Sequence, residues 1–111
     1  MAKIINLEKV ELKPHPKFKG VEIGFVTTKE YTQEMSITIL KIAPGVEIPI
    51  HTHENEVDSI FVLEGEGEIF IDGSWQPLKK GDIIVVPKKE EHGVKTNTEM
   101  LCYIVHAPAL W

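Results

Sequence analysis

Two histidines, His51 and His53, lie one residue apart in the stretch His-Thr-His-Glu-Asn-Glu-Val-Asp, which covers residues 51–58. On an extended strand, residues two apart point to the same face, so both imidazoles can reach one ion. Imidazole nitrogens suit zinc, copper, iron and nickel, and a carboxylate widens the choice toward iron and manganese. The spacing therefore indicates a metal site, although acidic, histidine-rich turns also occur on solvated surfaces.

Further ligands have to come from beyond this pair. Asp58 stands at the start of the next expected strand and is the first candidate, while Glu54 and Glu56 lie in the expected turn and are expected to face water. Two histidines and one carboxylate with open positions form the ligand set of non-haem iron oxygenases. His92 is a fourth candidate, because it opens another extended stretch over residues 93–95.

Four further polar and aromatic residues bear on the site, and one of them, His106, has two interpretations. His106 shares its parity with Cys102 and Ile104, so it either lines a cavity as a proton shuttle near neutral pH or caps the strand end in water. Cys102 is expected to be a small buried hydrophobic residue, and Tyr103, of opposite parity, is expected to pack. His15 stands between two prolines and is expected to be an exposed loop residue.

The composition is that of an acidic globular protein, which we expect to form one domain over residues 1–111. The net charge of −5 argues against a nucleic-acid surface, and no apolar run predicts a membrane span. One cysteine and a start without a signal-peptide pattern favour a cytoplasmic protein. All 12 basic residues are lysines. The absence of arginine either disfavours a dianionic ligand, because arginine is the usual clamp for one, or reflects a general bias toward lysine in the genome.

The sequence consists of short extended stretches separated by glycine and proline. Strands are expected over residues 21–26, 35–42, 59–63, 68–71, 75–78, 83–86 and 100–106. The best helical candidate covers residues 6–12, and Pro14 ends it. Asp72-Gly73 predicts a hairpin turn. This pattern indicates an all-β sandwich or barrel.

The spacing of these residues also resembles the two motifs of the cupin superfamily. Residues 45–65 resemble the first motif through Gly45, His51, His53, Asp58 and Gly65. Residues 81–97 resemble the second through Gly81, Asp82, Pro87 and His92. The family usually has glutamate in place of Asp58. Because aspartate is one methylene shorter, a site of three histidines remains an alternative.

The resemblance implies a double-stranded β-helix, or jelly-roll barrel, that holds one divalent transition metal ion (Fe, Mn, Ni or Zn). Its implied ligands are His51, His53, Asp58 and His92, and its cavity walls are expected among Ile37, Ile39, Leu40, Ile60, Val62, Ile84, Val86 and Ile104. The implied function is lyase, isomerase, decarboxylase or dioxygenase chemistry on a small organic molecule, or else binding of a small ligand such as a sugar without turnover. Fold alone does not decide among these.

The resemblance also implies a homodimer, because small cupins commonly pair and a small core gains stability from that burial. The segments at which we expect the contact are residues 1–20 and the apolar tail, residues 107–111.

Overall fold

The chain folds almost entirely into β-strands, as expected. The computed structural model describes residues 1–111, and a short 3₁₀ helix, Leu7–Lys9, precedes the first strand. The strands are β1 (Leu12–Pro14), β2 (Val21–Thr27), β3 (Ser36–Ile42), β4 (Glu47–His51), β5 (Val57–Glu64), β6 (Glu66–Ile71), β7 (Ser74–Lys79), β8 (Ile83–Val86), β9 (His92–Lys95) and β10 (Met100–Ala107). No helix has the length and apolarity needed to cross a membrane.

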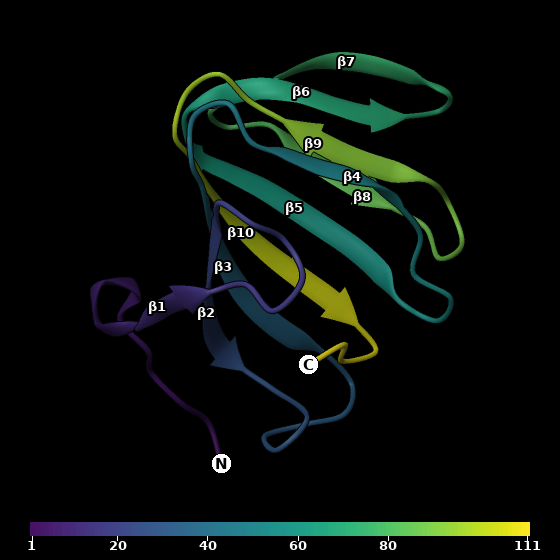
Figure 1. Cartoon of the computed structure of the whole chain (residues 1–111). Helices are drawn as coiled ribbons and strands as arrows, with labels where there is room; N and C mark the ends of the chain where they lie inside the picture. The colour runs from purple at the N-terminus through teal and green to yellow at the C-terminus, as the bar shows by residue number, and fades with distance from the viewer.

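The strands form two antiparallel sheets that face each other (Figure 1). One sheet has the order β1-β2-β3-β10-β5-β8, and the other has the order β4-β9-β6-β7. From β3 onward the chain passes repeatedly from one sheet to the other, with β6 and β7 as the one hairpin inside a sheet. This winding is a double-stranded β-helix, and it confirms the predicted fold class.

The core lies between the sheets because alternate residues of each strand point inward. Thirteen buried residues form one cluster: Val21, Ile42, Ile48, Ile60, Val62, Ile69, Leu78, Ile84, Val86, Val94, Met100, Cys102 and Ile104. On β5 and β10 the same inward-facing rows continue into Asp58 and His106, which are both buried. The strand register therefore places two ionisable side chains at the end of an apolar row.

The helical candidate over residues 6–12 is helical only in part. Only Leu7–Lys9 is helical, with the Asn6 side chain accepting a hydrogen bond from the backbone N–H of Glu8. Leu12 already belongs to β1, where it is paired with Gly24 of β2. Pairing to an existing sheet edge gives this segment backbone partners that an isolated short helix lacks.

Two glycines of the motif pattern make a matched test of backbone packing. Gly65 and Gly81 both have a left-handed φ, +88° and +91°. A Cβ on Gly65 would collide with the backbone oxygen of Glu99, whereas a Cβ on Gly81 would meet nothing within 4 Å. Alanine at either site is expected to lower the free energy of unfolding by about 1 kcal/mol because of the left-handed backbone conformation alone.

We expect Gly65→Ala to lower the free energy of unfolding by about 1–3 kcal/mol more than Gly81→Ala does, because the collision forces a backbone shift. Urea denaturation of the two variants beside the wild type measures the difference. Equal losses would show that the turn after β5 relaxes freely.

Candidate metal centre

Three histidines from the two motifs come together on the inner side of the four-stranded sheet, and we call His51, His53 and His92 the histidine cluster. His51 and His92 are paired residues of β4 and β9, with ring centroids 4.3 Å apart. His53 lies beyond the end of β4, and its ring centroid is 5.1 Å from that of His51 and 5.2 Å from that of His92. One candidate ligand nitrogen from each of the three lies within 4.8 Å of the others.

Asp58 and His106 meet this cluster from the opposite sheet. They are cross-strand partners on β5 and β10, and Nε2 of His106 lies 3.4 Å from Oδ2 of Asp58. The same carboxylate oxygen lies 3.2 Å from Nε2 of His92 and 3.6 Å from Nε2 of His53. His53, Asp58 and His106 therefore form a second group whose ligand atoms lie within 4.8 Å of one another.

Two imidazoles of the cluster are oriented by contacts between one ring nitrogen and a backbone carbonyl oxygen, which leaves the other ring nitrogen available to an ion. Nδ1 of His51 is 2.7 Å from the carbonyl oxygen of Pro49, and Nδ1 of His92 is 3.1 Å from that of Glu90. A carbonyl oxygen only accepts hydrogen bonds, so in the neutral form of both rings Nδ1 carries the proton and Nε2 keeps its lone pair. Metal-binding histidines usually have this arrangement, in which an outer carbonyl fixes the tautomer and ring orientation.

Unpartnered buried atoms at the same place fit a cation. Nε2 of His92 and Oδ1 of Asp58 are buried and have no hydrogen-bond partner. Leaving such an atom unpaired costs about 1–3 kcal/mol, and more for a charged group. A divalent ion bound by imidazole and carboxylate would use both atoms, so the residues present fit a metal site.

The electrostatics of the site favour an ionised carboxylate among imidazoles. Burial alone would raise the pKa of Asp58, but its contacts with His106, His53 and His92 outweigh burial and hold that pKa well below its usual range. Burial would likewise lower the pKa of His92, but Asp58 and the Glu90 carbonyl raise it. The pKa of His51 is lowered, mainly by burial.

The cluster faces a cavity of about 430 Å³. Of the expected walls, Leu40, Ile60 and Ile104 line the cavity. The others do not: Ile37 and Ile39 lie on the opposite face of β3 from Thr38 and Leu40, while Val62, Ile84 and Val86 are not among the lining residues. Further apolar lining comes from residues that the expectation missed: Ile23, Ile42, Ile48, Val94 and Cys102.

The expectation for His15 is wrong. It is half-buried and lines the cavity, together with Leu110 and Trp111 of the C-terminal tail. The flanking prolines suggested an exposed loop, and no local pattern in the sequence reveals that this loop folds back over the barrel. Glu54 is exposed, as expected, whereas Glu56 is half-buried, and neither belongs to a group of candidate ligands.

The sequence matches one family model and is similar to proteins of known function. A family model described as "Cupin domain" matches residues 38–107. The oxalate-binding protein of Thermotoga maritima is 29% identical over 91 residues, which are 77% of this chain and 75% of that protein. The L-ectoine synthase of Vibrio campbellii is 33% identical over 85 residues, which are 74% of this chain and 66% of the synthase.

The fold is also that of solved structures. The crystal structure of a predicted oxalate decarboxylase from Thermotoga maritima matches with a TM-score of 0.85 and 23% identity, covering 96% of this chain and 99% of that one.

Proposed function

The chain belongs to the cupin family, and we propose that it binds a small organic molecule beside a divalent transition-metal ion held by the histidine cluster and Asp58. The observation that carries this proposal is the pair of Nδ1–carbonyl contacts in His51 and His92, which leave Nε2 of each neutral ring available to an ion, with the Asp58 carboxylate beside Nε2 of His92. Asp58 is proposed as the fourth ligand because it already contacts His53 and His92. We infer iron, manganese, nickel or zinc from this donor set.

A divalent ion at this place supplies Lewis-acid catalysis for isomerisation, elimination or decarboxylation, and iron in addition supplies dioxygen activation. The chain itself contributes the surroundings of the ligand. Ile60, Ile104 and Val94 present apolar surface that excludes water from the cavity. The carbonyls of Pro49 and Glu90 keep the imidazoles oriented.

His106 is the residue that we propose as the proton shuttle. It lines the cavity, its Nε2 lies against Asp58, and its Nδ1 is buried without a partner. In this proposal His106 exchanges a proton with a ligand in the cavity, and the contact with Asp58 keeps its ring oriented.

Binding without turnover is the second candidate function, and the similarity to an oxalate-binding protein favours it. The two candidates differ in the fate of the bound molecule. A binding module releases its ligand unchanged, whereas an enzyme converts it to a product.

One experiment separates the two. Protein loaded separately with Fe²⁺, Mn²⁺, Ni²⁺ or Zn²⁺ is incubated with pools of small hydroxy acids, keto acids and sugars, and NMR measures both line broadening and product formation. We expect metal-dependent turnover that EDTA treatment and His51→Ala both abolish. Saturable binding without product would favour the binding module, and an absence of both metal uptake and binding would contradict the proposal.

A further inference from the structure

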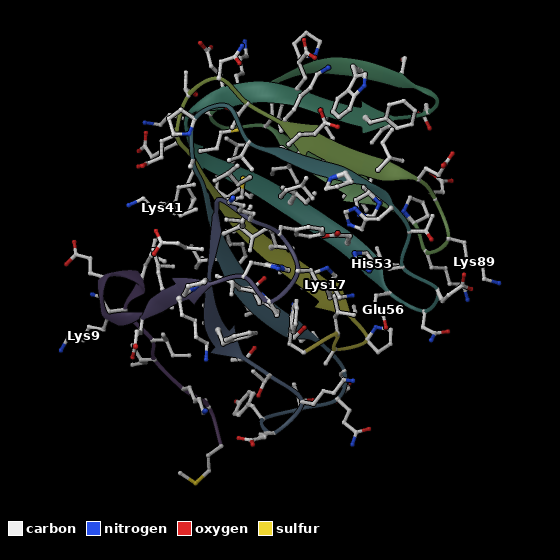
Figure 2. All side chains as sticks on the ribbon, viewed as in Figure 1. Lys9, Lys17, Lys41, His53, Glu56 and Lys89 are labelled. Carbon is white, nitrogen blue, oxygen red and sulfur yellow. The ribbon has the colours of Figure 1, made fainter.

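The cavity has a second polar region, formed by the loop between β1 and β2 (residues 15–20). This loop arches over the inner face of the six-stranded sheet (Figure 1), and it contributes His15, Lys17 and Phe18 to the cavity lining. Figure 2 shows Lys17 on this loop, on the same side of the barrel as His53. None of the three loop residues belongs to the candidate metal groups.

The hydrogen bonds of His15 fix which of its nitrogens can donate. Nδ1 lies 3.0 Å from the backbone nitrogen of Lys17 and 3.2 Å from that of Phe18. Both backbone groups are donors, so Nδ1 accepts and the proton of the neutral ring is on Nε2. Burial, and after it the nearby Lys17 ammonium, lowers the pKa of His15 and favours this neutral form. Nε2–H has no acceptor among the hydrogen bonds of the chain.

Aromatic packing holds the His15 ring in place. It stacks on Phe18 with centroids 4.6 Å apart, and the edge of Trp111 approaches it at 5.7 Å. Phe18 in turn lies 5.7 Å from the ring of His51. Phe18 therefore separates His15 from the histidine cluster, and a ligand that touches both ends of the cavity has to cover that apolar surface.

Lys17 is the only lysine that lines the cavity, and the chain has no arginine. It takes part in none of the ion pairs of the molecule, and its side chain is exposed, which places it at the cavity opening. The other permanently charged residue of the lining, Asp58, is already surrounded by three imidazoles. The loop thus brings one unpaired positive charge and one unpartnered neutral donor to the same cavity, and the two are near enough for Lys17 to lower the pKa of His15.

We propose that Lys17 and His15 bind the carboxylate of a small organic monoanion whose apolar body fills the cavity and whose other end faces the histidine cluster. The orientation of that other end rests on the proposed function, whereas carboxylate binding at the opening does not. Two donors and one positive charge match a single carboxylate. A second negative charge along the ligand would lie against the apolar surfaces of Phe18, Leu40 and Ile60.

Hexanoate and its neutral analogue 1-hexanol test the proposal as a chain-matched pair of probes. Calorimetric titration of both the metal-loaded and the EDTA-treated protein is expected to show hexanoate binding at least roughly tenfold more tightly than 1-hexanol, because a charge-assisted hydrogen bond contributes that much. Lys17→Met keeps most of the aliphatic stem. It is expected to weaken the binding of hexanoate about tenfold and to leave the affinity for 1-hexanol unchanged.

Two further variants control this result. Lys19→Met removes a lysine from the same loop that does not line the cavity, and it is expected to leave both affinities unchanged. His15→Phe keeps the stacking on Phe18 but removes the Nε2–H donor. Hexanoate should therefore bind several-fold more weakly, which is the effect expected from the loss of one hydrogen bond. Thermal unfolding of each variant verifies that the fold is retained.

Equal affinity for the two probes, no hexanoate binding, or the same affinity in Lys17→Met and Lys19→Met would each overturn the inference. Elemental analysis of the same samples keeps this result separate from the proposed function. Lys17-dependent binding in a protein that takes up no metal would contradict the metal site alone. A metal-loaded protein that binds hexanoate equally well with and without Lys17→Met would contradict the carboxylate site alone.

Discussion

His92→Ala is expected to weaken metal binding by at least about 100-fold. Loss of an outer hydrogen-bond partner of a ligand typically costs 10–100-fold in affinity, and loss of a direct ligand costs no less. His92 provides a buried Nε2 without another partner, and its ring contacts both His51 and His53. The two remaining histidines would then have only Asp58 to complete the site.

Competition with a chromophoric chelator measures this loss as a change in Kd. His15→Gln is the matched control, because it also removes a cavity-lining imidazole but lies outside the histidine cluster. Added metal should stabilise the wild type and the control by about 2.7 kcal/mol at one hundred times the wild-type Kd, and it should stabilise His92→Ala by no more than about 0.4 kcal/mol at that concentration. An unchanged Kd in His92→Ala would remove this residue from the ligand set.

Asp58→Asn is expected to destabilise the metal-free protein by about 2 kcal/mol near pH 5, with a smaller loss near pH 9. Asp58 is 4% exposed, and three imidazoles surround its carboxylate. Its pKa is lowered by folding from a usual value of 3.8, so the stability that it contributes is present above that value and is lost as the pH falls through the folded pKa.

The raised pKa of His92 sets the upper limit of the pH range in which Asp58 contributes most to stability. The pKa of His92 is raised by folding from 6.5, so its contribution is fully present below 6.5 and is lost as the pH rises through the folded pKa. The difference between wild type and Asp58→Asn should therefore be largest between about pH 4 and 6.5. Urea denaturation of EDTA-treated protein at several pH values measures it. A difference that grows toward pH 9 would contradict this charge arrangement.

The strands were predictable where one face is buried and the other is not. Residues 100–107 alternate in burial along the whole of β10. The β-forming residues of this stretch predicted the strand, and parity placed His106 in phase with Cys102 and Ile104 but left open whether it faces the cavity or water. Residues 12–14 gave no such signal, because β1 is short and its residues are not buried. Its pairing with β2 depends on a sheet that forms elsewhere in the chain.

The site was predictable in its ligand candidates but not in its contacts. The spacing of His51 and His53 indicated a shared ion, although His53 lies beyond the strand rather than on it. That Asp58 faces His106 depends on the register between β5 and β10, and a parity argument does not fix the register of strands far apart in sequence. His15 contacts Trp111 from the other end of the chain, so no local pattern could reveal its place.

The most direct test of the metal site is anomalous diffraction from crystals grown after reconstitution with Mn²⁺ or Zn²⁺, with data collected on both sides of the metal edge. We predict one strong peak per chain, about 2.0–2.2 Å from Nε2 of His51, His53 and His92. No peak, or a peak only among exposed carboxylates such as Glu54, would contradict the claim that these three histidines form a metal centre.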